Sequence, residues 1–102
     1  MARSGNAVHI ALLTVRGEGD RELAKRSLDR AMDNLQEQIR LNLHQDDIAS
    51  KCSVSQYIIL LSQANYENSC MVCQRVIKAF CRQYPHSPAE VTYSVHPLNP
   101  IF

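Results

Sequence analysis

The sequence predicts an α+β fold in which strands and helices follow the order β-α-β-β-α-β, the ferredoxin-like pattern. Two long segments repeat apolar side chains every three or four positions, as amphipathic helices do. Two short segments are almost wholly apolar and two are partly polar, as expected for central and edge strands respectively. The predicted fold is an antiparallel four-stranded sheet with both helices on one face.

The first half of the chain predicts a strand, a helix and the first strand of a hairpin. Residues 8–16, "VHIALLTVR", form an apolar run of strand length. After the break "GEGD", in which Asp20 is a candidate helix start, residues 21–43 carry a stripe of helical spacing. Residues 47–52, "DIASKC", predict a half-polar strand. The helical stripe consists of Leu28, Ala31, Met32, Leu35, Ile39 and Leu43.

The second half completes the hairpin and adds a helix and a strand. Residues 53–56, "SVSQ", predict the turn, and residues 57–61, "YIILL", predict a buried strand of aromatic and branched side chains. A second helix is expected from Asn65 to Tyr84, where prolines follow and end it. Residues 90–96, "EVTYSVH", alternate as a strand does. The apolar stripe of the second helix is Cys73, Val76, Ile77, Phe80 and Tyr84.

Length and composition predict one domain, at 8–98, between a flexible N-terminal segment at 1–7 and a C-terminal tail at 99–102. Apolar residues make up 45% of the chain, which is enough for a core. The net charge of +1 argues against a strongly basic surface, so direct DNA binding is not expected. The sequence has no run of membrane-spanning length and no signal peptide, which predicts a cytoplasmic protein without membrane contact.

The cysteines and histidines predict no metal site, cofactor or catalytic group. Cys70 and Cys73 form a Cys-x-x-Cys inside the second predicted helix, without the second pair that a zinc site requires. All four cysteines are expected to be free thiols, because the cytoplasm is reducing. The histidines are scattered and are expected at surface or loop positions, namely His9, His44, His86 and His96.

The segment 47–62, "DIASKCSVSQYIILLS", resembles the hairpin of the GGDEF (diguanylate cyclase) family, which typically reads "DvvaRyGGDEFvvLLp". Lys51 falls on the usual Arg of that family and Cys52 on its usual aromatic residue. "HIALLTVR" and "VTYSVH" match the family's "lallDiD" and "vTvSiG" strands, so the resemblance covers residues 8–98. The five signature letters fall on Ser53, Val54, Ser55, Gln56 and Tyr57. Tyr57 is expected in the core with its hydroxyl at the rim.

Residues 52–98 resemble more closely the C-terminal GGDEF-like domain of bacterial transcriptional regulators that carry a winged helix and a bacterial transcriptional activator domain upstream. Those domains have letters such as "YSVSQYxxLLPxAxYEN" and "FRRxYPxSP", where this chain has "CSVSQYIILLSQANYEN" and "FCRQYPHSP". The resemblance implies a reduced, nucleotide cyclase-like version of the fold. It also implies sister domains of a larger regulator as partners, with a homodimer as the alternative.

The letters that replace the signature imply that the domain is not an enzyme. The family binds Mg²⁺ through aspartates of the first strand and an acid of the hairpin, where this chain has Thr14, Arg16 and Ser55. A hydroxyl is a poor substitute for a carboxylate, and the Arg16 cation would repel a metal ion. Val54 fills space that a signature glycine leaves to the nucleotide. The expectation is a degenerate signature hairpin beside a remnant pocket at Thr14 and Arg16.

The family's product-inhibition motif, Arg-x-x-Asp, falls on the letters "HQDD" at 44–47. Asp47 is retained, but His44 stands in place of the arginine. An imidazole lacks the planar, two-pronged donor that arginine offers to a guanine or a phosphate. These remnant positions therefore argue against binding of a cyclic dinucleotide.

Two functions agree with these features. One is a regulatory or interaction domain, whose contact surface would be the sheet face that the helices leave open. That face would carry alternate residues of the central strands, such as Ala11 and Leu13 or the residues between them. The alternative is a sensor of a small nucleotide or metabolite in the remnant pocket, which predicts a concave site near Thr14, Ser53 and Ser55.

A third function, an RNA-binding module of the same shape, ranks last. Such modules stack bases on aromatic side chains of the open sheet face. Here Tyr57 and Tyr93 are the only aromatic residues on predicted strands, and the net charge is near neutral.

Overall fold

The computed structural model describes residues 8–19, 21–62 and 64–98. The elements follow the predicted order and are β1 (Val8–Gly17), α1 (Lys25–Asn42), β2 (Ile48–Ser53), β3 (Gln56–Ser62), α2 (Tyr66–Gln83) and β4 (Ala89–Pro97). The predicted flexible segment at 1–7, the tail at 99–102 and the helix start at Asp20 lie outside the described residues.

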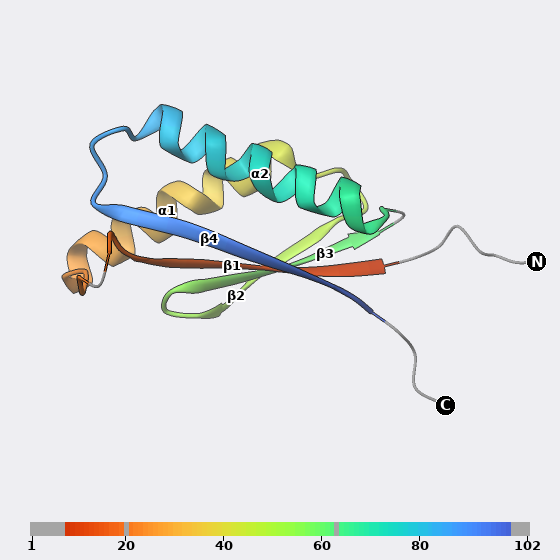
Figure 1. Ribbon diagram of the computed structural model, residues 1–102, viewed down its shortest axis with the longest axis horizontal. Helices are drawn as coiled ribbons and strands as arrows, with labels where there is room; N and C mark the ends of the chain where they lie inside the picture. Colours follow the sequence, from red (N-terminus) through yellow and green to blue (C-terminus); the bar gives the residue numbers. More distant parts are fainter. Residues whose placement is uncertain (1–7, 20, 63, 99–102) are drawn as a thin grey trace, which may run out of the picture.

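One antiparallel sheet contains all four strands, in the order β2-β3-β1-β4. The apolar strands β1 and β3 are central and the partly polar strands β2 and β4 lie at the edges, as predicted. Figure 1 shows α1 and α2 side by side on one face of this sheet. The α+β, ferredoxin-like fold class is therefore confirmed.

Helix α1 begins at Lys25, four residues later than predicted. The chain first makes a tight turn, in which the N–H of Arg21 donates to the carbonyl of Glu18 (3.3 Å). Gly17 is required there, because a side chain at this position would collide with the Arg21 carbonyl. Gly19 follows with a φ of 66°, a conformation that other residues rarely adopt.

Helix α2 begins where predicted. The Asn65 side chain accepts a hydrogen bond from the N–H of Asn68 (2.7 Å) and thereby caps the helix. Among the described residues, neither this helix nor any other is long and apolar enough to cross a membrane.

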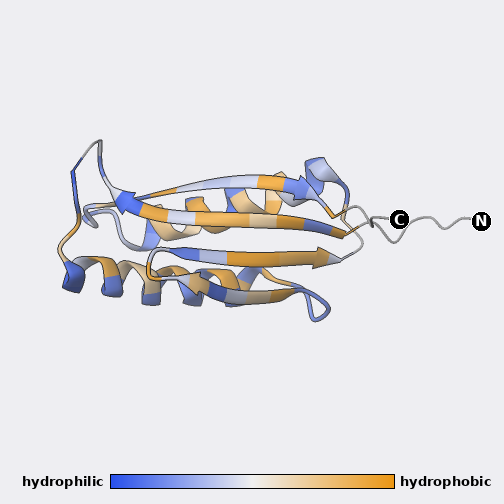
Figure 2. Ribbon diagram, turned by 90° about the horizontal axis from the view of Figure 1, so that it is seen from below, coloured by the Kyte–Doolittle hydropathy of each residue, from blue (hydrophilic) through white to orange (hydrophobic). Residues whose placement is uncertain are grey.

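The core lies between the helices and the sheet. On β1 and β3 every second side chain faces the helices and is buried, which accounts for Ala11, Leu13, Val15, Tyr57, Ile59 and Leu61. The helices contribute Ala31, Met32, Leu35, Ile39, Val72, Cys73, Val76 and Phe80. The intervening residues of the central strands point to the open face, which Figure 2 shows in front of the helices.

Candidate functional site

The turn of the β2–β3 hairpin is shorter than predicted and consists of Val54 and Ser55 alone. The Ser53 hydroxyl accepts a hydrogen bond from the N–H of Ser55 (3.2 Å) and contacts the Gln56 side chain (3.3 Å). Gln56 in turn donates through Nε2 to the Thr14 hydroxyl on β1 (3.1 Å). These polar side chains therefore satisfy one another and fix the hairpin against the central strand.

The structure separates the two residues assigned to the remnant pocket. Thr14 lies beside Gln56, within the hairpin network. Arg16 instead pairs across to the edge strand, where its Nε lies 3.3 Å from Oε1 of Glu90. Both side chains of this pair are largely exposed, so it adds little to stability. Arg16 therefore belongs to the β1–β4 surface and not to the hairpin.

Tyr57 fastens the hairpin to α1. It is 4% exposed, and its hydroxyl donates to the Met32 carbonyl (3.1 Å). The prediction of a hydroxyl at the rim is wrong, because the hydroxyl reaches a carbonyl of the covering helix and is buried with it. Burial, reinforced by the nearby charge of Asp33, raises the pKa of Tyr57. The hairpin strand and α1 thus share one buried polar contact.

A cavity of about 820 Å³ lies between the hairpin and the N-terminal half of α1. Lys51 and Val54 of the hairpin line one side of it. The other side holds residues of the β1–α1 connection and of α1, namely Glu22, Leu23, Lys25, Leu28, Asp29 and Asp33. The position partly agrees with the predicted concave site, but Thr14, Ser53 and Ser55 do not line this cavity. The Ser53 and Thr14 side chains are instead hydrogen-bonded to Gln56.

Sequence reasoning missed the charged groups of this hairpin cavity. It did not single out Asp29 and Asp33, and both line the cavity wall. Their four-residue spacing, continued from Lys25, is the signal that places them on one side of the helix. Lys25 and Asp29 form an exposed ion pair (2.9 Å). Within the described parts of the chain, no three His, Cys, Asp or Glu side chains form a group that could bind a metal ion.

His44 and Asp47, the remnant inhibitory positions, lie together in the turn before β2. The N–H of Asp47 donates to the His44 carbonyl (3.0 Å). The Asp47 carboxylate accepts from the N–H of His44 (3.1 Å) and from the N–H of Ser62 (3.1 Å). This carboxylate therefore joins the turn to the end of β3.

His9 contradicts the prediction of surface histidines. It is only 7% exposed, because it points to the helix side of β1, where its ring lies 6.4 Å from that of Tyr66. Its Nδ1 is buried and has no hydrogen-bond partner among the described residues. The four cysteines are free, in agreement with the expectation, and Cys73 is fully buried.

The sequence matches no protein-family model and no curated protein. The fold matches a DGC protein from Thermotoga maritima at a TM-score of 0.67 and 10% identity, over 90% of this chain and 66% of that one. It also matches the GGDEF domain of DgcB from Caulobacter crescentus, in complex with c-di-GMP, at 0.71 and 7% identity, over 94% and 62%.

A third similar structure is the diguanylate cyclase SiaD from Pseudomonas aeruginosa, in complex with its activator SiaC. The TM-score is 0.60 at 19% identity, over 91% of this chain and 38% of that one. The chain thus spans less than two thirds of the length of each of these structures. At such identities the likeness concerns the fold, and the fold is GGDEF-like.

These comparisons contradict the prediction that the chain is not an enzyme. The three similar structures are a DGC protein, a GGDEF domain and a diguanylate cyclase, so the chain has a fold that cyclases use. The prediction inferred inactivity from Thr14, Arg16 and Ser55 at the metal-binding positions and from Val54 at a signature glycine. It did not count the carboxylates of Glu22, Asp29 and Asp33, which the fold brings to the hairpin cavity.

Proposed function

We propose that residues 8–98 form a GGDEF-like regulatory domain that works by contact with a sister domain of a larger bacterial transcriptional regulator in the cytoplasm. The observation that carries this proposal is the apolar open face of the sheet. Ile10 pairs with Leu60 across β1 and β3, and Leu12 pairs with Ile58. All four side chains point away from the helices and are only half-buried.

The edge strand β2 extends this surface. Ile48 pairs with Leu60 and is 60% exposed, so the apolar patch continues across β2, β3 and β1. We call Ile10, Leu12, Ile48, Ile58 and Leu60 the open-face patch. Contiguous exposed apolar patches of this kind mark surfaces that another protein covers. Figure 2 shows apolar segments along the strands of this face.

Two further features support this function. The resemblance of residues 52–98 to the C-terminal domain of transcriptional regulators supplies the sister-domain context. A structural neighbour, the cyclase SiaD, is found in complex with its activator SiaC, which makes protein contact a precedent for this fold. The hairpin residues Ser53 to Tyr57 then serve shape and contact, and DNA binding is left to another domain.

The experiment compares two exposed apolar residues of similar exposure. Ile48→Lys places a charge in the open-face patch, and Met71→Lys places one on α2, where the residue is 57% exposed. In the full-length regulator, cross-linking between this domain and its sister domain should fall with Ile48→Lys and persist with Met71→Lys. Sedimentation of the 102-residue chain tests the alternative, a homodimer through the same face. Absence of both sister-domain contact and self-association would refute the proposal.

The second candidate is a small-ligand sensor, favoured by the hairpin cavity of about 820 Å³. Its charged lining and its size suit a nucleotide or a similar metabolite. Thermal-shift measurements with GTP and Mg²⁺ should show stabilisation that Lys51→Gln reduces, because Lys51 lines the cavity and Lys78 does not. Lys78→Gln is the control, and equal shifts in both variants would exclude this site. The same samples should be analysed for a cyclic dinucleotide product.

A further inference from the structure

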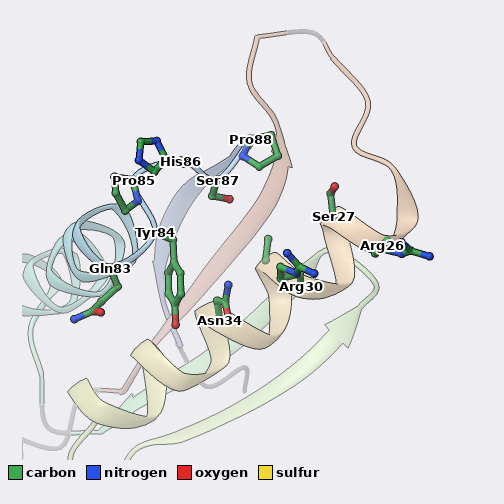
Figure 3. A pocket seen from close by; sticks show the side chains of 11 residues that line it. Arg26, Ser27, Arg30, Asn34, Gln83, Tyr84, Pro85, His86, Ser87 and Pro88 are labelled. Atoms are coloured by element: carbon green, nitrogen blue, oxygen red, sulfur yellow. The ribbon is translucent and has the colours of Figure 1, made fainter.

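A second cavity lies on the other side of α1, away from the hairpin. Its volume is about 400 Å³, within the usual range of small-ligand pockets. It is enclosed by the first half of α1, the end of α2 and the loop that leads to β4 (Figure 3). We call it the basic cavity, because its lining contains two arginines and a histidine and no carboxylate.

The wall opposite α1 is held in a fixed position. The N–H of Ser87 donates to the Tyr84 carbonyl (3.1 Å), and the N–H of Glu18 donates to the Pro88 carbonyl (3.3 Å). The prolines of this loop restrict its backbone further. The Tyr84 ring packs against Phe80, with 5.4 Å between ring centroids. The basic cavity is therefore preformed, which lowers the ordering cost of binding a ligand.

Three side chains of different chemistry face the same space. Figure 3 shows Asn34 of α1 beside the ring of Tyr84, and Arg30 one helical turn before Asn34. None of the three side chains makes a hydrogen bond or an ion pair with another residue that the structure describes. Together they supply a guanidinium, an amide with donor and acceptor, and a half-buried aromatic face.

Within the described parts of the chain, the two arginines on this side of α1 form no ion pair. Arg26 and Arg30 lie one helical turn apart, where like charges repel each other. The acidic residues that follow them closely in sequence, Asp29 and Asp33, line the hairpin cavity instead. The Arg26 guanidinium points away from the loop in Figure 3, so Arg30 is the cation best placed toward the cavity. A bound anion would relieve the repulsion.

We propose that the basic cavity binds a small phosphate monoester that carries a flat ring, as a mononucleotide does. Arg30 would bind the phosphate, because a guanidinium pairs with phosphate oxygens through parallel N–H bonds. The Tyr84 face would stack on the ring, and the Asn34 amide would bond its edge. This site is separate from both the hairpin cavity and the open-face patch.

Calorimetric titration of the chain with AMP, inorganic phosphate and adenosine tests the proposal. AMP should bind saturably and more tightly than either of the other two. Arg30→Gln should weaken AMP binding by roughly tenfold or more, because the charge-assisted hydrogen bonds to the phosphate are lost. Lys78→Gln, which removes an exposed cation outside the cavity, should leave it unchanged. Tyr84→Leu should weaken AMP binding but not phosphate binding.

The competing outcomes are distinct. Equal loss in Arg30→Gln and Lys78→Gln would indicate nonspecific attraction by charge and would overturn the site. Adenosine or phosphate binding as tightly as AMP would overturn the combination of phosphate and ring. No saturable binding of AMP by a chain with unchanged circular dichroism would overturn the proposal as a whole.

Discussion

The two sides of α1 differ in charge although their residues alternate in sequence. Lys25, Asp29 and Asp33 line the hairpin cavity, whereas Arg26 and Arg30 line the basic cavity. Successive residues of an α-helix point about 100° apart, so neighbours in sequence face different partners. A rotation of α1 by one residue would turn one of these two sets away from its cavity and toward the other.

The difference indicates two kinds of surface. On the hairpin side, charges of both signs line a larger cavity, and Lys25 and Asp29 compensate each other. On the other side, Arg26 and Arg30 are without an ion-pair partner among the described residues, and the opposite wall is hydrogen-bonded in place. The hairpin side therefore suits a polar ligand with both kinds of charge, and the basic side suits a small anion.

The largest expected effect comes from loosening the helix that both cavities share. Leu35 is fully buried under α1, so Leu35→Ala should lower the free energy of unfolding by about 2–5 kcal/mol. Leu41→Ala, at a residue of the same helix that is 60% exposed, should change it by less than about 0.5 kcal/mol. Urea denaturation measures both. Equal effects would mean that α1 does not pack on the sheet through this stripe.

A smaller effect concerns pH, because two buried side chains of the core, Cys73 on α2 and Tyr57 on β3, have a raised pKa. Burial, and then the neighbouring Cys70, raises the pKa of Cys73 in α2 from 9.0 to about 12. Above pH 9 the unfolded chain releases this proton while the folded chain keeps it. The free energy of unfolding should therefore fall by about 1.4 kcal/mol per pH unit in the window that begins there. Below pH 9 this contribution is fully present.

Urea denaturation at a series of pH values checks this dependence. Cys73→Ala should flatten it between pH 9 and 10, and Cys81→Ala should not, because Cys81 is exposed. The pKa of Tyr57 is also raised above its usual value of 10.0. Above pH 10 the unfolded chain therefore releases the Tyr57 proton while the folded chain keeps it, and the free energy of unfolding falls further. An unchanged slope in Cys73→Ala would assign the alkaline loss to another group.

The smallest expected effect concerns the hydrogen bond that joins Tyr57 of β3 to α1. Tyr57→Phe removes the hydrogen bond to the Met32 carbonyl and should cost about 1 kcal/mol. Tyr93→Phe is the control, since its hydroxyl accepts an exposed hydrogen bond from Gln74 (2.9 Å). We expect the control to cost less, because water replaces that bond. Thermal unfolding of the two variants makes the comparison.

The sequence predicted the elements well because their patterns are local. The alternation along 8–16 and the stripe through Leu35 each depend on neighbouring residues only. The late start of α1 was missed because the chain first makes a turn closed by the hydrogen bond from the Arg21 N–H to the Glu18 carbonyl, which the side-chain pattern does not reveal. His9 was misplaced because one histidine in an apolar run gives no sign of which sheet face it occupies.

The candidate site was predicted in position more accurately than in composition. The hairpin at 53–57 was identified, and so was its network partner Thr14. Arg16 was assigned to the same site, but the register of β1 against β4 turns it toward Glu90. The inference of an inactive domain followed from comparing signature letters one by one, which leaves out groups contributed by other elements.

The sequence by itself determined the fold class, the two central strands and the helix faces that enter the core, since hydrophobic periodicity encodes these along the chain. Only the tertiary structure decided which charged residues meet at each cavity. Asp33 lies near Tyr57, and Arg30 near Tyr84, through packing between elements that are far apart in sequence. Such proximity depends on the orientation of α1 on the sheet, which no local pattern specifies.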